Sequence, residues 1–406
     1  MARFERKIHA EGHLIDSDLL SGAMDRVIRE GGRFKILDFR LGRTNDEPSS
    51  IDMLVEADSE SRLLALLEQL SDFGFVPGGQ REAALEAAPA DGVAPEDFYS
   101  TTNHRTEVRL GGDWQRVREQ RMDACIVWDG TTAACVKLRD VRAGQQVVVG
   151  LEGVRVIPEF VPRDRSDFSF MGGEVSSERQ VRLAVERVAQ WVRDTRAAGK
   201  RIVWVPGPVV IHTGAAPDLA ALIDAGYVDA LLSGNALAVH DVESAFFDTS
   251  LGISTRDGTS IHLGHRHHMR AINAIRAAGG LAAAVASGVL TRGICYALVK
   301  NDVPFVLAGS IRDDGPLPDT EMDLIRAQEA YAHELRDAGL VIVLSTMLHG
   351  IGVGNMLAGE VPLVCVDIHP AVVTKLADRG SSQTHGIVTD VGLFLHLLRK
   401  ALLPSG

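Results

Sequence analysis

Several features are missing from this sequence, and each absence excludes a class of protein. No apolar stretch is long enough to span a bilayer, since the longest, Leu281–Leu290, is short and rich in alanine. The N-terminus is charged and lacks the apolar segment of a signal peptide. No CxxC pair occurs among the cysteines, Cys125, Cys135, Cys295 and Cys365. We therefore expect a soluble cytoplasmic protein with reduced, buried thiols.

Basic runs and common catalytic motifs are also absent. The formal net charge is −12 and no lysine/arginine run occurs, so nucleic acid and membranes are not expected partners. The chain has no GxxxxGK[ST] loop and no GxSxG elbow, which disfavours ATP chemistry and α/β-hydrolase chemistry. The 406 residues suffice for two or three domains with a large core.

Residues 1–80 are predicted to form a small α+β module of the ferredoxin-like or ACT-like kind. Strand patterns at Phe4–Gly12, Phe34–Leu41 and Ser50–Ala57 alternate with helical patterns at Leu19–Glu30 and Ser61–Phe73. This βαββα order is typical of such modules. They often bind amino acids or pair between subunits, although packing alone could explain this one.

Residues 81–165 are predicted to form a small β-rich domain. Ala83–Pro95 has the composition of a linker or exposed loop. Short strand patterns separated by glycine turns follow at Glu107–Leu110, Ala124–Trp128, Val147–Gly150 and Val154–Pro158. The polar cluster Tyr99–Asn103 precedes them, where turn chemistry and a functional role are both open.

Residues 166–406 alternate strand and helix patterns, which predicts a doubly wound, mainly parallel α/β sheet. Strands are expected at Arg201–Val210, Val228–Leu232 and Val303–Ala308, and a long helix at Thr320–Ala338. The other expected helices are Asp218–Ala225, Ala238–Phe247, two between residues 268 and 289, and Leu393–Leu402. Ligands of such sheets bind beyond the carboxyl ends of the strands.

The most informative stretch is Leu340–Val366 with Asp367 directly after it. It is interpreted as two buried strands joined by a glycine-rich turn, with a carboxylate at the end of the second strand. Gly350, Gly352 and Gly354 would let the backbone approach a phosphate, and Asp367 would accept hydrogen bonds from a ribose. The spacing is shorter than a usual crossover. The stretch is therefore either an uncommon nucleotide site or a loop that merely turns.

Polar residues follow four predicted strands. Ser233–Ala236 could hold a phosphate or an amide through backbone N–H groups and Asn235. Gly309–Pro316 gathers two carboxylates beside an arginine, either for function or to begin a turn and cap a helix at Thr320. The third and fourth groups are Thr346–His349 and Asp367-Ile368, the latter supported by Thr389–Val391, where Asp390 is also a good N-cap.

The histidine cluster His262, His265, His267 and His268 suggests a metal. However, no HExxH motif is present and no carboxylate stands at ligand spacing in the sequence, so no metal site is expected. A surface loop or a substrate contact is the preferred interpretation.

Six segments together carry a family resemblance. They are GHLIDSDLL, FYSTTNHRTEV, FSFMGGEVSSER, LLSGNALAVHDVE, FVLAGSIRDDGPLPD and VCVDIHPAVVTKLADRG. From about residue 4 to its end, the chain resembles the family that carries the LOR/SDH bifunctional-enzyme conserved region. That family includes the archaeal-type ornithine cyclodeaminases and the C-terminal part of the cyanobacterial arginine dihydrolase/ornithine cyclodeaminases.

The resemblance implies a Rossmann-like, deoxyhypusine-synthase-like domain that binds NAD. It also implies conversion of L-ornithine to L-proline and ammonia, with a tightly bound NAD regenerated in each turnover, as part of arginine/ornithine metabolism. We further expect a homo-oligomer. The cofactor role carries over to the residues that match the family motifs: Asn235, Ala236, Asp314, Thr346, Met347, Leu348, His349, Asp367, Ile368, Asp390 and Val391.

For the chemistry itself, we expect Asp313 to orient or deprotonate an ornithine amine, and Asn103 and Arg312 to anchor the substrate carboxylate. Two other functions stay open. An NAD-dependent amino- or imino-acid dehydrogenase with net redox would use the same residues, and a non-catalytic amino-acid-binding regulator would rely on the front module.

Overall fold

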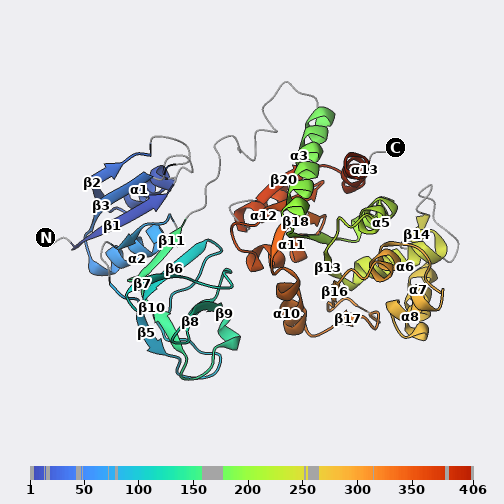
Figure 1. Cartoon of the computed structure of the whole chain (residues 1–406), viewed down its shortest axis with the longest axis horizontal. Coiled ribbons are helices and arrows are strands. Elements are labelled where there is room, and N and C mark those ends of the chain that lie inside the picture. Colours follow the sequence, from blue (N-terminus) through green and yellow to red (C-terminus); the bar gives the residue numbers. More distant parts are fainter. Residues whose placement is uncertain are drawn as a thin grey trace. The chain divides into compact units, whose positions relative to one another are not determined.

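The chain forms two compact units in a computed structural model (Figure 1). The first unit comprises residues 1–166, 355–360 and 381–383, and the second comprises 167–354, 361–380 and 384–406. The structure describes residues 4–12, 14, 19–42, 47, 49–71, 73–77, 81–157, 177–250, 253–254, 265–313, 315–379 and 384–403.

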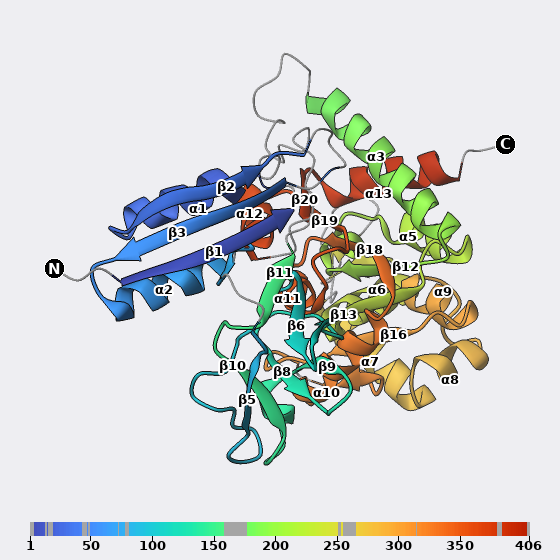
Figure 2. The same ribbon diagram turned by 60° about the vertical axis from the view of Figure 1, so that its left-hand side comes forward.

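The first unit begins with the predicted α+β module. Its elements are β1 (Phe4–Gly12), α1 (Leu19–Arg29), β2 (Arg33–Arg40), β3 (Ser49–Ala57), α2 (Glu60–Ser71) and β4 (Val76–Pro77). The strands pair in the order β2-β3-β1-β4, and the long pairs are antiparallel (Figure 2). Every second side chain of β3 is buried against the two helices, as a half-buried strand requires. β4 completes the ferredoxin-like order βαββαβ.

The rest of the first unit is β-rich, as expected. Its elements are β5 (Ala84–Ala87), β6 (Arg105–Leu110), β7 (Asp113–Arg116), β8 (Cys125–Trp128), β9 (Ala133–Val136), a 3-10 turn at Leu138–Asp140, β10 (Gln146–Val149) and β11 (Val154–Ile157). They form the sheets β5-β10-β8-β9 and β11-β6-β7.

One expectation for this part was wrong. Ala83–Pro95 is not a simple linker, because β5 lies inside it and pairs with β10, and Ala83 and Ala88 are buried. The division of the chain at residues 80 and 165 into three domains stays a prediction.

The second unit is built on one parallel sheet. Within the described residues its strands are β12 (Arg201–Pro206), β13 (Ala230–Gly234), β16 (Phe305–Ala308), β17 (Thr320–Glu321), β18 (Ala338–Leu344), β19 (Leu363–Asp367) and β20 (Thr384–Val388). They lie in the order β17-β16-β13-β12-β18-β19-β20, and every pair is parallel. The chain moves outward from β12 on one side and from β18 on the other, so the strand order reverses between them. This is the Rossmann-like arrangement predicted from the sequence.

Helices cover the sheet, and a short hairpin of β14 (Thr249–Ser250) and β15 (Ile253–Ser254) follows α6. The helices are α3 (Ser177–Ala197), α4 (Val209–His212), α5 (Ala216–Asp224), α6 (Asn235–Phe247), α7 (His265–Ala278), α8 (Leu281–Ala286), α9 (Ile294–Lys300), α10 (Leu324–Glu334), α11 (Met347–Met356), α12 (Pro370–Arg379) and α13 (Val391–Leu402).

The fully buried run Leu340–Leu344 shows why β18 is apolar throughout. Leu340, Ile342 and Leu344 join a core with residues of α3, α5, α9 and α13. Val343 points to the other face, where it lies against Gly350 of α11. Because helices cover both faces of the sheet, every position of the strand is apolar.

Three local expectations in the second unit were wrong. The strand predicted at Arg201–Val210 ends at Pro206, because Pro208 has no N–H with which to continue the hydrogen-bonded ladder and α4 follows. The helix predicted at Thr320–Ala338 begins at Leu324, after Asp323 as its N-cap, and ends at Glu334. The segment joining β18 and β19 is the helix α11, not a glycine-rich turn.

Two bulk expectations can be compared with the described residues. No helix in the described ranges combines the length and apolarity needed to cross a bilayer. The four cysteines are free and buried.

Two carboxylates that accept hydrogen bonds at helix N-termini give a test of the fold. The carboxylate of Asp241, which is buried, accepts hydrogen bonds from the backbone N–H groups of Ile294 (2.8 Å) and Cys295 (2.7 Å) at the start of α9. Exposed Asp323 accepts from Ile325 (2.9 Å) and Arg326 (3.2 Å) at the start of α10. We expect Asp241→Ala to lower the free energy of unfolding by about 3 kcal/mol, because it leaves two buried N–H groups without an acceptor. Asp323→Ala should lower it by about 1 kcal/mol. Urea unfolding followed by circular dichroism measures both. Equal losses in the two variants would contradict this assignment.

Candidate functional site

The parallel pairing puts the carboxyl ends of all the strands of the large sheet at one edge. Gly207 follows β12, Asn235 follows β13, Gly309 follows β16, Ser345 follows β18, Asp367 ends β19 and Thr389 follows β20. In open α/β sheets, ligands bind at this edge, beside the place where the strand order reverses. That place lies between β12 and β18.

The ends of β12 and β18 lie unusually close together. The N–H of Gly207 donates to the carbonyl of Leu344 at 2.7 Å, and a Cβ built on Gly207 would overlap the carbonyl oxygen of Ser345. Ser345 has a positive φ of 46°, which is uncommon for a residue other than glycine and concentrates at functional sites. The chain therefore turns sharply into α11, and this helix begins at the place where the strand order reverses.

The unit β18-α11-β19 has the geometry of a nucleotide-binding crossover. Asp367 ends the second strand, about 20 residues after the turn, as in the dinucleotide fingerprint. Its Oδ1 accepts from the N–H of His369 at 2.8 Å, and among the described residues its Oδ2 has no hydrogen-bond partner. Ile368 beside it is exposed. The carboxylate is thus fixed, with one oxygen available to accept a hydroxyl hydrogen.

The glycines in this unit do not form the phosphate-binding turn that was predicted from the sequence. Gly350, Gly352 and Gly354 lie inside α11 instead of in a loop. A Cβ on Gly350 would come within 3.0 Å of Val343 and 3.1 Å of Leu376, so this glycine lets the helix pack closely on the strand. The groups available to a phosphate are the backbone N–H groups in the first turn of α11, where Met347 and Leu348 are exposed.

The half-buried His349 lies behind this turn. The hydroxyl of Tyr331 donates to the carbonyl of Ser233 at 2.7 Å and lies 3.0 Å from Nδ1 of His349. Since the hydroxyl has one hydrogen, Nδ1 of His349 must carry its own and donate it to Tyr331. Burial lowers the pKa of His349 and raises the pKa of Tyr331, so both are neutral near pH 7. Nε2 of His349 is then an acceptor, next to Gly234 at the end of β13.

A second network joins the ends of β13 and β16. Nδ2 of Asn235 donates to Asp313 Oδ1 at 3.0 Å, and Asn235 Oδ1 accepts from Leu317 N (3.1 Å) and Thr320 Oγ1 (2.9 Å). The other oxygen of Asp313 accepts from Ser310 N at 2.6 Å. The amide of Asn235 is therefore occupied by protein groups, which leaves the backbone of this turn for a ligand.

Two neighbours of this network are exposed. Ala236 is exposed at the start of α6, and Arg312 is exposed, with its N–H donating to Ser310 Oγ at 3.2 Å. Asp314 lies outside the described residues.

At the end of β20, Asp390 acts as a helix N-cap, which is the simpler of the two interpretations of its sequence position. Asp390 Oδ1 accepts from Leu393 N at 2.9 Å, which makes Asp390 the N-cap of α13. Val391 is buried in the core below. Their cofactor role stays a prediction.

Asn103 belongs to the first unit. It is buried, and its carbonyl accepts from Gly359 N at 2.7 Å in the same unit. Neighbouring Thr101 uses its hydroxyl on the carbonyls of Arg121 (2.7 Å) and Ala124 (3.2 Å), so turn chemistry explains this part of the polar cluster. The substrate role of Asn103 stays a prediction.

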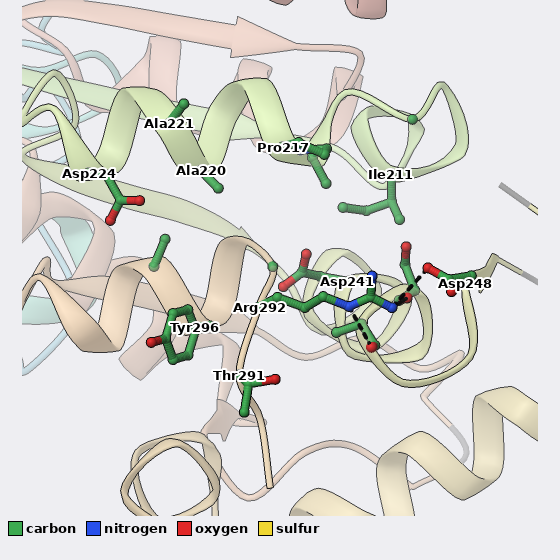
Figure 3. A pocket seen from close by; sticks show the side chains of 16 residues that line it. Ile211, Pro217, Ala220, Ala221, Asp224, Asp241, Asp248, Thr291, Arg292 and Tyr296 are labelled. Atoms are coloured by element: carbon green, nitrogen blue, oxygen red, sulfur yellow. Dashed lines mark hydrogen bonds and ion pairs between the residues drawn. The ribbon is translucent and has the colours of Figure 1, made fainter. Parts of the chain in front are cut away.

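A separate pocket of about 510 Å³ lies between α5, α6 and α9 (Figure 3). Arg292 lies in it and donates to Asp248 at 2.8 Å. None of the residues expected to bind cofactor lines this pocket.

Sequence reasoning missed Gly207, Ser345, Tyr331 and Glu243. Pro206-Gly207-Pro208 is a visible signal for a strand end. The other three have no local signal, because their importance arises from contacts between distant segments. Glu243 matters because it lies beside His268, although no carboxylate was expected near the histidine cluster. His262 of that cluster lies outside the described residues, and the side chain of His265 is not described.

The chain matches three family models along its length. Residues 5–104 match the LOR/SDH bifunctional enzyme conserved region. Residues 105–185 match the first region, and residues 186–398 the Rossmann fold, of the C-terminal part of arginine dihydrolase ArgZ-like proteins.

Similar proteins cover almost the whole chain. The ornithine cyclodeaminase of Methanothermobacter thermautotrophicus is 47% identical over 396 residues, which are 97% of this chain and 96% of that protein. The bifunctional arginine dihydrolase/ornithine cyclodeaminase AgrE of a Nostoc species is 50% identical over 406 residues, 98% of this chain but 58% of that protein. The chain thus spans little more than half the length of its bifunctional relatives.

A solved structure is similar as well. It is the crystal structure of the ternary complex of AgrE with ornithine and NAD⁺, which is 49% identical with a TM-score of 0.54 and aligns over 98% of this chain and 57% of that one. On the identity and coverage of the archaeal relative and the three matched regions, this chain belongs to the LOR/SDH conserved-region family with an ArgZ-like C-terminal Rossmann domain.

Proposed function

We propose that this protein is an ornithine cyclodeaminase, which converts L-ornithine to L-proline and ammonia with a bound NAD. The observation that carries the proposal is the β18-α11-β19 unit, with a helix N-terminus at the reversal point of the strand order and Asp367 at the end of the second strand. The archaeal relatives that align over almost all of both chains are ornithine cyclodeaminases, which supports the substrate.

The residues present fit a dinucleotide. The backbone N–H groups at the start of α11 suit a pyrophosphate, and the available oxygen of Asp367 suits a ribose hydroxyl. The close contact between Gly207 and Ser345 keeps side chains away from this part of the edge. NAD, when bound, supplies a hydride acceptor that can return the same hydride, so the conversion needs no net redox change.

The chain itself would supply positioning and proton transfer. His349 presents an unprotonated Nε2 at this edge, and its pKa, lowered by burial, keeps it neutral. Asp313 is our candidate for orienting or deprotonating an ornithine amine, since Asn235 and Ser310 hold its carboxylate in place. Arg312, exposed on the same loop, and Asn103 are candidates for the substrate carboxylate.

We also propose a cytoplasmic homo-oligomer. The free, buried thiols are compatible with a reducing compartment. The outer strand β2 exposes Ile36, Leu37 and Phe39, and an apolar edge of this kind favours pairing with another copy. The relation of the Rossmann-like domain to the deoxyhypusine-synthase fold stays a prediction.

Incubation of the purified chain with L-ornithine tests the function, with proline, ammonia and NADH measured with and without added NAD. We expect proline and ammonia in equal amounts and no accumulating NADH, because the hydride returns to the product. NADH formed in proportion to ornithine consumed would instead indicate a net dehydrogenase. Binding of ornithine without consumption would indicate a regulatory protein.

The role of Asp313 is tested by Asp313→Asn. We expect turnover to fall by at least about 100-fold, because the carboxylate is lost, while NAD binding measured by calorimetry changes little. Asp302→Asn is the matched control, since Asp302 is exposed and has a positive φ of 54°, which asparagine tolerates. Near-normal turnover in Asp313→Asn would remove Asp313 from the mechanism.

A further inference from the structure

A fully buried carboxylate lies away from the strand ends discussed above. Glu243 is in the third turn of α6, and its side chain is 0% exposed. A buried carboxylate is costly unless cations or hydrogen-bond donors surround it. Its neighbours include two imidazoles and a hydroxyl.

Two histidines face the same oxygen of this carboxylate. His240 lies one turn earlier on α6, and its Nδ1 is 3.7 Å from Glu243 Oε2. His268 comes from α7, which packs against α6, and its Nδ1 is 3.4 Å from Oε2. In a tetrahedral zinc site the ligand atoms are about 3.3 Å apart. The spacing around Oε2 is therefore close to that of a metal site.

His240 adds an independent observation. It is 7% exposed, and its Nδ1 is buried without a hydrogen-bond partner in the structure. Buried polar atoms are almost always paired, so an unpaired one aimed at a carboxylate indicates a missing ligand. One ligand atom from each of His240, Glu243 and His268 fits within 4.8 Å of the others.

The surroundings hold the carboxylate in place, as groups that hydrogen-bond to metal ligands do in metal sites. Thr249 Oγ1 donates to Glu243 Oε1 at 2.9 Å, and it lies 3.0 Å from Nδ1 of His267. Because the Thr249 hydrogen goes to the carboxylate, His267 must donate to Thr249. His212 packs edge-on against His240, with ring centroids 4.8 Å apart, and its Nδ1 is 2.7 Å from Ser250 Oγ. These contacts fix Glu243 and leave its Oε2 facing the two imidazoles.

We propose that His240, Glu243 and His268 bind a divalent transition-metal ion of the zinc class. Two imidazoles and one carboxylate form a common ligand set for such ions and leave one coordination position for water or another ligand. His268, whose side chain is 33% exposed, provides the route of entry. The proposal depends only on these contacts within the second unit and stands apart from the proposed function.

Metal titration of the full chain tests the site. The protein is stripped with a chelator and titrated with Zn²⁺, and stoichiometry and thermal stability are measured. We expect one tightly bound Zn²⁺ per chain and a rise in Tm, because the ion binds only the folded state. Glu243→Gln keeps the acceptor for Thr249, and His268→Asn removes one imidazole. Each should weaken binding at least about 100-fold.

The matched control is His333→Asn, since His333 is an exposed histidine of the same unit. It should bind Zn²⁺ like the unmodified chain. Co²⁺ titration of the unmodified chain gives a second readout that needs no variant, because nitrogen and oxygen ligands produce a visible d–d absorption. If neither Zn²⁺ nor Co²⁺ bound tightly, the proposal would be overturned. Unchanged Zn²⁺ affinity in both Glu243→Gln and His268→Asn would overturn it as well.

Discussion

The contact between the ends of β12 and β18 is the constraint on which the second unit depends. Gly207 donates its N–H to Leu344, and no Cβ fits between Gly207 and Ser345. The strand order reverses at this contact, so one half of the sheet grows outward from each strand. The same contact forces the turn at Ser345 from which α11 begins. The position of the helix N-terminus and that of Asp367 both follow from it.

Two networks hold the strand ends around this contact. Tyr331 ties His349 to the carbonyl of Ser233, and Asn235 ties the end of β13 to Asp313. Both use side chains far apart in the sequence, and both leave backbone groups or a ring nitrogen available at the edge. The site is therefore made of groups that hydrogen bonds within the protein hold in position before a ligand binds, which lowers the free-energy cost of binding.

The elements of the fold were largely predictable from the sequence because their signals are local. Buried runs such as Leu340–Leu344 and the alternation in β3 indicate strands directly. The glycine-rich segment after β18 was misread because three glycines lower the helix propensity of α11, which packing of Gly350 on Val343 and Leu376 outweighs. The strands β17 and β20 and the helices α3, α9 and α12 were not predicted. Shortness explains this only for elements such as β17 and α9, whose periodic signals are weak.

The site was less predictable than the fold. Polar turns at strand ends point to an edge, and the pairing of β13, β16, β18 and β19 does bring those turns to one edge. Which side chains are already occupied, as in Asn235, depends on contacts that spacing does not encode. The nearness of Glu243 to His268 likewise depends on the packing of α6 against α7. The substrate came from family resemblance, because no residue pattern specifies ornithine.

Hydrogen exchange of the nucleotide-free chain, measured by mass spectrometry with and without NAD, tests most directly whether the sheet edge holds the dinucleotide. The account predicts slower exchange of backbone amides at residues 345–349 and 367–369, with residues 216–224 and 293–297 around the α5–α6–α9 pocket unchanged. Slower exchange around that pocket, with the strand ends unchanged, would contradict it.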